Sequence, residues 1–553
     1  MHVNISRRGA AGLGVGGTAD LATDVRTLSW RGCAAVQNVH AGCSFGDLIV
    51  RSIAQHGDRV AFQQGDRWLS YRKLGEQISQ VCQVFEEHGL RKGDGVAHLT
   101  QNCPEEFIVS AAAYIAGLRY VPLHPRGSLD DFSYIIGDSE ASAVVIQTGT
   151  FPEVAAGLVL PSDVVLFSHS RWEGGVDLFR AAGERTPAPL VVRSAEDDIA
   201  RVAYTGGTTG RPKGVMQSHR SLVACTVISV AEMEWPQDLR FLCCTPMSHA
   251  TAYLIMPVLT QGGTFVLQTN FSPANFCEQV ERFRITSTFL VPTMIYSLLD
   301  DPVLDRHDMS SLQHVLYGAS PASPTRLREA MKRFGPVFQQ AYGLTESPNC
   351  ITTLKPAEHL TDDDQRFSSC GIPYMGMQVV VQDDDGQLVP SGSVGEVCVR
   401  GPLVMQGYWH TPEETAAAMS GDWFHTGDMG YFDDRGLLFL VDRKKDMIIS
   451  GGFNVYAREV EDVLTAHPAV AQAAVIGVPD KKWGEAVKAL VVLRSGSQVS
   501  GEELISAVKQ AKGSVQAPKS VDFVDGLPVT AIGKLDKKAI RAPFWKDSQR
   551  QVH

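Results

Sequence analysis

The chain has 553 residues, of which 44% are hydrophobic and 20% charged, a balance that excludes wholesale disorder. Its length allows roughly three to four domain-sized units, or one large α/β body with a smaller domain attached. There are 50 Lys and Arg residues against 61 Asp and Glu, so the formal charge is −11, and no long basic run occurs. This argues against a nucleic-acid-binding protein, which needs clustered cations.

The eleven cysteines are scattered, form no C-x-x-C pair and are too few for a disulfide scaffold. No run approaches the roughly 18 apolar residues that a membrane span requires. We therefore expect a reduced, cytoplasmic protein without structural zinc and without an integral membrane segment. Residues 1–40 are expected to be a flexible leader, with an export signal after Arg7-Arg8 as the less favoured alternative.

Alternating helical and strand patterns follow the leader. Phe45–His56 and residues 71–88 have helical spacing, and VAFQQGDRWLSY between them predicts a hairpin around Gly65-Asp66. VAHLT, YVPL and SAVVI predict short strands, and a helix is expected from Pro104, which Asn102 could cap. Strands that alternate with helices predict a parallel sheet wrapped in helices.

The same alternation recurs from about residue 220 to 345, and the pattern changes beyond residue 370. VVVQDDDGQLV predicts a hairpin with Asp385-Gly386 at its turn, and GEVCVRG and YFDDRGLLFLV continue the short strands, so we expect a β-rich subdomain. The charged cluster 442–446 fits an exposed hinge, although a simple polar turn explains it equally well. The remaining residues, with a helix at Ala457–Ala466, could form a small α+β domain.

The strongest local signal is the string AYTGGTTGRPKG at 203–214. Glycines allow successive backbone N–H groups to converge on an anion, hydroxyls add donors, and a lysine adds a point charge. The string therefore predicts a polyphosphate cradle, although it is neither a Walker A loop nor a dinucleotide fingerprint, and a flexible turn would explain it equally well in isolation. The residues concerned are Thr205, Gly206, Gly207, Thr208, Thr209, Gly210 and Lys213.

The complete string TGGTTGRPKG resembles the phosphate loop of the adenylate-forming superfamily, which contains acyl-CoA synthetases, nonribosomal-peptide adenylation domains and beetle luciferases. Further resemblances follow in order along residues 43–541. PMSHA is similar to the acyl-site block, YGASP to the adenine-side loop, and QAYGLTE and FHTGD to the magnesium and ribose motifs. VDRKKDMIISGGFNVY resembles the hinge and pantetheine segment, and LPVTAIGK the block that holds the catalytic lysine. The fatty-acyl and steroid-acid CoA ligase branch is the most similar.

This resemblance implies nucleotide-binding roles for residues that alone would pass as ordinary surface or core side chains. Glu346 would hold Mg²⁺ between phosphate oxygens, and Tyr342 would stack on adenine. Asp428 would accept hydrogen bonds from the ribose diol, with Arg443 adding a ribose or phosphate contact. Gln340 would hydrogen-bond the adenine amino group. The nucleotide site would be completed by Gly318, Ala319, Ser320, Gly343 and Thr345.

The resemblance assigns catalysis to Lys534, His249, Glu346 and Thr205. Lys534 would enter from the C-terminal domain and stabilise the charge between the acyl carboxylate and the α-phosphate, whereas Lys537 and Lys538 are expected to be ordinary surface charges. Rotation of this domain about Lys445 would then withdraw Lys534. It would present Ser450, Gly451 and Gly452, with Gly452 lining the pantetheine tunnel because a side chain would block it.

We therefore expect an α/β fold in which a large domain of helix-wrapped sheets and a β-rich subdomain occupy residues 41–442. A small, mobile α+β C-terminal domain would occupy residues 443–553. The domain boundary falls in the charged cluster, because the resemblance places the hinge there.

The acid is expected to be bulky and hydrophobic: fatty, alicyclic or aromatic. No acidic residue lies between Pro246 and Gln261, so an α-amino group would have no partner there. The pocket would be lined by His249, Ala250, Leu254 and Gly318, and the small side chains at 318–320 would leave room for rings.

The resemblance implies an ATP-dependent acyl-CoA ligase, which adenylates the acid, releases pyrophosphate and transfers the acyl group to CoA. ATP, Mg²⁺ and CoA are the expected cofactors. The phosphopantetheine of an acyl carrier protein could replace CoA, because both present the same thiol arm. A non-catalytic nucleotide-binding relative is less favoured, because Lys534, Glu346 and Asp428 are all present. A homodimer is also left open.

Overall fold

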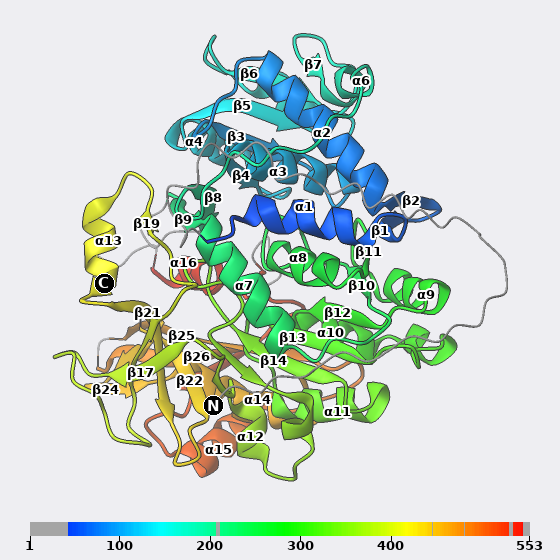
Figure 1. Ribbon diagram of the computed structural model, residues 1–553. Coiled ribbons are helices and arrows are strands. Elements are labelled where there is room, and N and C mark those ends of the chain that lie inside the picture. Colours follow the sequence, from blue (N-terminus) through cyan, green and yellow to red (C-terminus); the bar gives the residue numbers. More distant parts are fainter. Residues whose placement is uncertain (1–41, 206–210, 445, 481, 530–534, 546–553) are drawn as a thin grey trace, which may run out of the picture. The chain divides into compact units, whose positions relative to one another are not determined.

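The structure is a computed structural model that describes residues 42–205, 211–444, 446–480, 482–529 and 535–545 (Figure 1). In this part of the chain the strands form four sheets, which we name A to D. Sheets A and B contain parallel strands joined by helices, and sheet C is antiparallel. The expected α/β class with a β-rich portion is therefore confirmed.

Sheet A has nine strands in the order β16-β15-β14-β13-β12-β10-β11-β1-β2. Its centre is parallel, and the antiparallel strands β2, β15 and β16 lie at its two ends. The parallel strands are β1 (Val60–Gln64), β10 (Arg240–Cys243), β11 (Thr264–Leu267), β12 (Ser287–Leu290), β13 (His314–Gly318) and β14 (Phe338–Tyr342). The end strands are β2 (Arg67–Ser70), β15 (Thr352–Leu354) and β16 (Ile372–Pro373).

Sheet B has eight strands in the order β19-β9-β8-β4-β3-β5-β6-β7. Strands β8 and β3 to β7 are parallel, whereas β9 and β19 run antiparallel to their neighbours. The bounds are β3 (Gly95–Leu99), β4 (Arg119–Leu123), β5 (Ala141–Ile146), β6 (Val165–Ser168), β7 (Val176–Asp177), β8 (Ile199–Thr205), β9 (Lys213–Ser218) and β19 (Gly407–Tyr408).

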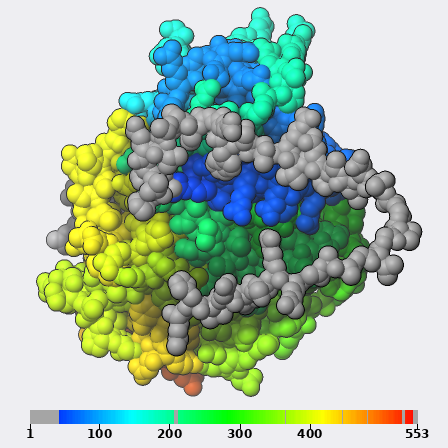
Figure 2. Space-filling view, in the orientation of Figure 1, coloured from blue at the N-terminus to red at the C-terminus, as the bar shows by residue number. Residues whose placement is uncertain are grey.

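Helices fill the space between sheets A and B. The largest apolar cluster joins Phe62, Phe241 and Phe265 of sheet A with Val96 and Tyr120 of sheet B. Buried side chains of α1 (Phe45–His56), α3 (Pro104–Ala116), α7 (His219–Glu232) and α8 (Ala252–Thr260) lie within the same cluster. Figure 2 shows the blue residues of the α1 region as a band between the cyan and green parts of the surface.

Local signals in the sequence account for several helix ends. The Ser44 hydroxyl accepts from the Asp47 N–H while the Asp47 carboxylate accepts from the Ser44 N–H, a capping box that starts α1. The other helices are α2 (Tyr71–Glu87), α4 (Leu129–Asp138), α5 (Pro152–Gly157), α6 (Leu178–Gly183), α9 (Pro273–Phe283), α10 (Pro292–Asp300), α11 (Pro324–Phe334), α12 (Asp364–Ser368), α13 (Pro412–Ala418), α14 (Ala457–Ala466), α15 (Gly501–Lys512) and α16 (Lys537–Trp545). Two short 3₁₀ helices are η1 (Pro302–Arg306) and η2 (Pro356–His359).

Sheets C and D lie later in the chain. Sheet C consists of β17 (Gln378–Gln382), β18 (Gly395–Arg400), β20 (Met419–Ser420), β21 (Trp423–Phe432) and β22 (Leu438–Arg443), all antiparallel. Sheet D consists of β23 (Ile448–Ser450), β24 (Phe453–Val455), β25 (Val470–Asp480), β26 (Gly484–Leu493) and β27 (Ser520–Phe523). Helices α14 and α15 contribute buried side chains to the core of sheet D.

Most of the predicted elements are confirmed, and one local prediction, the cap of α3, is wrong. The residue before α3 is Cys103, and Asn102 does not cap this helix. Its amide instead donates to the Thr245 and Gln268 carbonyl oxygens, a use that no local pattern reveals. The expected hairpin at 379–389 is present, since the Asp383 N–H donates to the Gln387 carbonyl oxygen, the Val389 N–H donates to the Val381 carbonyl oxygen, and Gln382 bridges Leu388. No helix in the described residues is long and apolar enough to cross a membrane.

Candidate functional site

The candidate phosphate loop joins β8 to β9, with Thr205 paired to Lys213 in the antiparallel register. Residues Gly206, Gly207, Thr208, Thr209 and Gly210 lie outside the described residues. The Lys213 Nζ lies 2.5 Å from a carboxylate oxygen of Glu414 in α13 and 5.6 Å from the ring centroid of Tyr408. The predicted phosphate cation is therefore already paired with a carboxylate, and an incoming phosphate would compete with Glu414.

Glu346 is positioned beside this hairpin. Tyr408, in β19 next to β9, donates from its hydroxyl to Glu346 Oε1 at 3.0 Å, and the Met405 N–H donates to the Glu346 carbonyl oxygen at 2.8 Å. Gln217 of β9 is fully buried, and its amide donates to the Thr345 carbonyl oxygen at 2.7 Å. The structure thus brings Lys213 and Glu346 to the same aromatic side chain.

A second cluster joins three predicted nucleotide residues. The Tyr342 hydroxyl donates to Asp428 Oδ2 at 2.6 Å, and Arg443 Nε lies 3.0 Å from Asp428 Oδ1. Asp428 in β21 and Arg443 in β22 are direct partners across sheet C. Asp428 is 5% and Tyr342 7% exposed, and burial together with the Asp428 charge raises the pKa of the Tyr342 hydroxyl well above its ordinary value. The carboxylate predicted to bind ribose is therefore held from two sides.

The adenine-side residues lie on adjacent strands. Gln340 in β14 is buried, and its side-chain oxygen has no hydrogen-bond partner in the described part of the chain, which leaves it available to a ligand. Ala319, which directly follows β13, has a left-handed backbone (φ +66°), a strained conformation for alanine that recurs at functional sites. Ser320 and Gly343 are partly exposed beside these strands.

Gly318 packs tightly against the neighbouring strand. A Cβ atom at this position would overlap the Ala341 carbonyl oxygen of β14. The close approach of two parallel strands therefore accounts for the glycine, and its place in the acid pocket stays a prediction.

The acyl-site block lies after β10. The rings of His249 and His124 meet edge to face with centroids 4.6 Å apart, and burial lowers the pKa of His124 to about 4. The Ala250 carbonyl oxygen accepts from the Asn349 amide at 2.9 Å, which ties this block to the loop that carries Glu346. Leu254 has no exposed surface and belongs to the core, whereas its neighbours Ala252 and Tyr253 are partly exposed.

In the C-terminal region, Gly451 and Gly452 form the turn between β23 and β24, with φ of +61° and +82°. A two-residue hairpin turn with both φ values positive favours glycine. This preference is independent of any role of the two glycines in a pantetheine tunnel. Ser450, at the end of β23, is buried. Lys445 and Lys534 lie outside the described residues. Lys537 is not the expected surface charge, since its side chain is 15% exposed and its Nζ lies 2.9 Å from Glu461.

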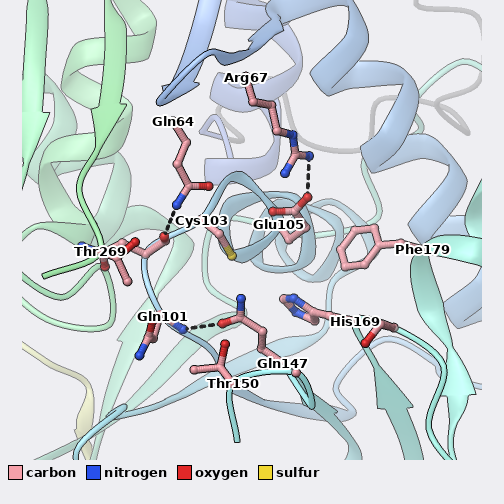
Figure 3. A pocket seen from close by; sticks show the side chains of 13 residues that line it. Gln64, Arg67, Gln101, Cys103, Glu105, Gln147, Thr150, His169, Phe179 and Thr269 are labelled. Atoms are coloured by element: carbon pink, nitrogen blue, oxygen red, sulfur yellow. Dashed lines mark hydrogen bonds and ion pairs between the residues drawn. The ribbon is translucent and has the colours of Figure 1, made fainter.

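A polar cavity of about 360 Å³ opens at the carboxyl ends of β3, β5 and β6 (Figure 3). Gln101, Gln147 and His169 follow these strands, and Arg67 and Glu105 form an ion pair of 2.5 Å across from them. Asn102 also lines this cavity and accepts from the Met247 N–H at 2.9 Å. The cavity is thereby connected to the segment that precedes His249.

Sequence patterns missed several of these residues. Tyr408, Gln217, Asn349 and His124 belong to none of the recognised motifs, and Tyr408 is 62 positions from the carboxylate it contacts. Contacts between distant segments bring Tyr408 to Glu346, Gln217 to Thr345, Asn349 to Ala250 and His124 to His249. No signal in a single sequence could have identified them.

The comparisons with known proteins agree with this geometry. Residues 49–409 match the AMP-binding enzyme family, and residues 459–534 match the AMP-binding enzyme C-terminal domain. The chain belongs to the AMP-binding enzyme family. This confirms the resemblance to adenylate-forming enzymes that the motifs indicated. The medium/long-chain-fatty-acid–CoA ligase FadD8 of Mycobacterium tuberculosis is 44% identical over 523 residues, which cover 92% of this chain and 91% of that protein.

Two further similar proteins carry names that indicate other products. The fatty acid–[acyl-carrier-protein] ligase ScoC of Streptomyces coeruleorubidus is 31% identical over 88% of this chain and 94% of that protein. Among solved structures, the amide bond synthetase McbA from Marinactinospora thermotolerans is 35% identical, with a TM-score of 0.82 over 90% of this chain and 99% of that chain. Members similar to this chain over most of its length thus carry names with three kinds of acceptor.

Proposed function

We propose that this AMP-binding enzyme is an ATP-dependent acid–CoA ligase that adenylates a bulky hydrophobic carboxylic acid and transfers the acyl group to CoA. The observation that carries this proposal is the position of Tyr342 and Glu346, which are four residues apart. Tyr342 is the last residue of β14, and Glu346 lies in the loop that follows it. Tyr342 contacts Asp428, and Glu346 contacts Tyr408 beside the phosphate-loop hairpin. The nearness of these two clusters supports the assignment of a nucleoside site to the first and a phosphate site to the second.

The first step converts a poor electrophile into a good one. A carboxylate oxygen of the acid attacks the α-phosphate of ATP, and pyrophosphate leaves as the mixed anhydride forms. Both reactants are anions, so positioned cations and N–H donors must hold them together. We assign this role to the 205–210 loop and to Lys534, with His249 at the acid side.

Glu346 fits a magnesium site. It is partly exposed, and Tyr408 occupies Oε1, which leaves Oε2 as a hard oxygen ligand. Mg²⁺ in nucleotide sites is held by one or two carboxylates plus phosphate oxygens, and the described residues contain no group of three or more His, Cys, Asp or Glu side chains that could hold a metal ion alone. When bound with ATP, Mg²⁺ neutralises charge on the leaving pyrophosphate.

In the second step the CoA thiol attacks the acyl carbonyl carbon, the carbon–oxygen bond to AMP breaks, and the thioester and AMP form. We propose that residues 443–553 act as a separate domain that turns about Lys445 between the steps. Ser450, Gly451 and Gly452 would then line the path of the pantetheine arm. The exposed turn of Gly452, where nothing lies within 4 Å of an added Cβ, is compatible with this path.

The acceptor has two alternatives. An acyl carrier protein presents the same thiol arm as CoA, and an amine would take the acyl group directly as an amide. Each is the acceptor in the name of a relative described above, and the glycine turn does not discriminate between the two thiols. A non-catalytic nucleotide-binding role is the least favoured, because Lys534, Glu346 and Asp428 are all present in the sequence.

The apolar character of 250–260 favours a hydrophobic acid over an amino acid. Among the described residues of that segment no acidic side chain is present, so an ammonium group would be buried without a partner. We also infer a cytoplasmic location, because ATP and CoA are available there. A homodimer remains an expectation that light scattering of the purified protein can test.

The test is a reaction with ATP, Mg²⁺ and a panel of acids, with pyrophosphate release and acyl products measured separately. CoA, a holo acyl carrier protein with a free phosphopantetheine thiol, and an amine are supplied in parallel. We expect acid-dependent pyrophosphate release and an acyl-CoA product. Pyrophosphate release without any acyl-CoA product would indicate that the carrier protein or the amine is the acceptor. The absence of pyrophosphate release with every acid would overturn the proposal.

A further inference from the structure

A buried arginine lies behind the acyl-site block. Arg201, in β8, is 3% exposed, and its Nη2 donates to the Ser248 carbonyl oxygen at 2.5 Å. Its guanidinium carbon stands 5.1 Å from the ring centroid of Tyr253. No carboxylate forms an ion pair with Arg201 in the described part of the chain, and its Nε has no hydrogen-bond partner there.

A buried glutamate lies nearby. Glu106, in α3, is 4% exposed, and its Oε1 accepts from the Tyr120 hydroxyl at 2.9 Å. Its Oε2 is buried and has no partner among the described residues. Burying a carboxylate and a guanidinium with unsatisfied atoms is unfavourable, so a feature of this kind requires an explanation.

Both side chains line one small cavity. Tyr114, Tyr120 and Tyr253 contribute to its polar wall, and the apolar wall comes from Phe45, Phe107, Leu222, Cys225, Ala252 and Ile255. The cavity volume is about 20 Å³, which is enough for one oxygen atom with its hydrogen and too small for a ring. The two residues that carry the unsatisfied atoms therefore border a space of water size.

The cavity adjoins the region that we assign to the acid. Ala252, Tyr253 and Ile255 lie in α8, three to six residues after His249. Arg201 contacts Ser248, the residue before His249, and Tyr253 donates from its hydroxyl to Gln217, which in turn donates to the Thr345 carbonyl oxygen. The walls of the cavity are thus continuous with both the acyl-site block and the loop of Glu346.

We propose that this cavity is the distal end of the acid pocket and binds a hydroxyl group on the acid, with Arg201 Nε donating a hydrogen bond to the hydroxyl oxygen and Oε2 of the ionised Glu106 accepting a hydrogen bond from the hydroxyl. A hydroxyl satisfies both orphaned atoms, whereas a carbonyl oxygen accepts only and a methyl group does neither. The assays are therefore run at pH 8, above the raised pKa of Glu106. The substrate class is therefore a hydrophobic acid with an alcohol or phenol far from its carboxylate. This inference rests on the proposed ligase function.

The test compares matched acids that differ by one hydroxyl. Three pairs cover different lengths and widths: cinnamate and its para-hydroxy derivative, dodecanoate and its terminally hydroxylated derivative, and naphthoate and a hydroxynaphthoate. In the wild-type enzyme we expect kcat/KM to favour the hydroxylated acid by about tenfold or more in at least one pair, because a site with buried polar groups rejects the partner that leaves them unpaired.

Two variants test whether Arg201 and Glu106 cause the preference for the hydroxylated acid. Arg201→Met should reduce the ratio within that pair to about threefold or less, and Glu106→Gln, which keeps the size of the side chain and the acceptor for Tyr120, should reduce it several-fold. Loss of the contact with Ser248 slows both acids of a pair, so the ratio is the informative quantity. Arg326→Met is the matched control, since Arg326 is also buried but pairs with Asp300 and Glu329 on α10 and α11, and it should leave the ratio unchanged.

This inference would be overturned if the wild-type enzyme turned over the acids but its kcat/KM ratio between hydroxylated and unsubstituted acid stayed below about threefold in all pairs. The ligase function would then still stand, and the cavity would hold only water. An unchanged ratio in Arg201→Met would overturn the inference as well. If that variant does not fold, the isosteric Glu106→Gln decides in the same way. Failure of the wild-type enzyme to activate any acid would overturn the ligase proposal and this inference together.

Discussion

The Tyr342 hydroxyl donates a 2.6 Å hydrogen bond to Oδ2 of Asp428, a residue 86 positions later in the chain. The other oxygen of the same carboxylate lies 3.0 Å from Arg443 Nε. A carboxylate held by two charge-assisted contacts keeps a fixed orientation, and each oxygen retains a lone pair for a further donor. This relationship joins sheet A to sheet C at the point where we place the nucleoside.

Replacement of Asp428 tests the ribose assignment. Asp428→Asn should raise KM for ATP by about 10- to 100-fold, because a hydrogen bond to a charged group contributes roughly 1.5–3 kcal/mol. Tyr342→Phe should have a smaller effect, because Arg443 still holds the carboxylate. Steady-state kinetics with varied ATP check both, and Tyr431→Phe in the same strand as Asp428 is the control. An unchanged KM in Asp428→Asn would remove Asp428 from the site.

Replacement of the catalytic lysine should separate the two half-reactions. Lys534→Ala is expected to slow adenylate formation by about 10²–10³-fold, the usual effect of removing one preorganised charge donor. Thioester formation from a supplied acyl-adenylate should persist. Lys538→Ala, an exposed lysine close in sequence, serves as the control. Pyrophosphate release from Lys534→Ala near the wild-type rate would show that another group stabilises the transition state.

A bulky residue in the glycine turn should act on the second step alone. Gly452→Leu is expected to permit adenylation and block thioester formation, because the added side chain would fill the path of the pantetheine arm. The positive φ at 452 means that leucine also strains the turn. Gly436→Leu supplies that strain at another open turn, with φ of +78°, and should affect neither step. Equal loss of both half-reactions in Gly452→Leu would point to a folding defect.

The size of the acid should determine its rate. Each buried CH₂ contributes about 0.8 kcal/mol, so four or five unfilled methylenes should cost acetate roughly 3–4 kcal/mol relative to a large hydrophobic acid. That corresponds to a discrimination of a few hundredfold in kcat/KM. A competition between acetate, an α-amino acid, a straight-chain acid and a fused-ring acid measures it, and preferential activation of either small acid would contradict a large apolar pocket.

The buried glutamate should make the unfolding temperature depend on pH. Burial raises the pKa of Glu106 from 4.5 to about 7, with Tyr120 and Arg201 opposing the shift. Burial raises the pKa of Tyr114 and of Cys243, and the nearby Glu106 carboxylate adds to the rise in each. Between these pH values the folded state keeps a proton that the unfolded state has lost, so the wild-type protein loses stability as pH rises from about 4.5 to 7.

Glu106→Gln removes this penalty, which amounts to about 3 kcal/mol for a shift of that size. The variant should therefore unfold at a higher temperature than the wild type at pH 8, and the two should converge near pH 4.5. Glu105→Gln is the control, because Glu105 is paired with Arg67 and its pKa is lowered. A difference between Glu106→Gln and wild type that does not vary with pH would show that Glu106 ionises normally in the folded protein.

Much of the fold and the family could be predicted from the sequence, because the signals are local. The apolar spacing of 45–56 and 457–466 corresponds to α1 and α14 residue by residue, since an amphipathic helix needs no knowledge of its partner. The motif strings around Thr205, Glu346 and Asp428 identified the family for a similar reason: loops that bind a common ligand use short, contiguous sets of residues.

What only the tertiary structure decided concerns contacts between distant segments. Asn102 was expected to cap a helix, yet its amide bonds to Thr245 and Gln268, because a buried amide satisfies whichever polar groups the packing of two sheets places beside it. The close approach of Gly318 to the carbonyl oxygen of Ala341 on the adjacent strand is also a tertiary constraint that the sequence does not reveal. The contact of Tyr408 with Glu346 and the shared cavity of Glu106 and Arg201 likewise depend on strand pairing and helix packing. Hydrophobic pattern and turn chemistry are encoded locally, whereas the partner of a buried polar group is set by the three-dimensional arrangement of the whole core.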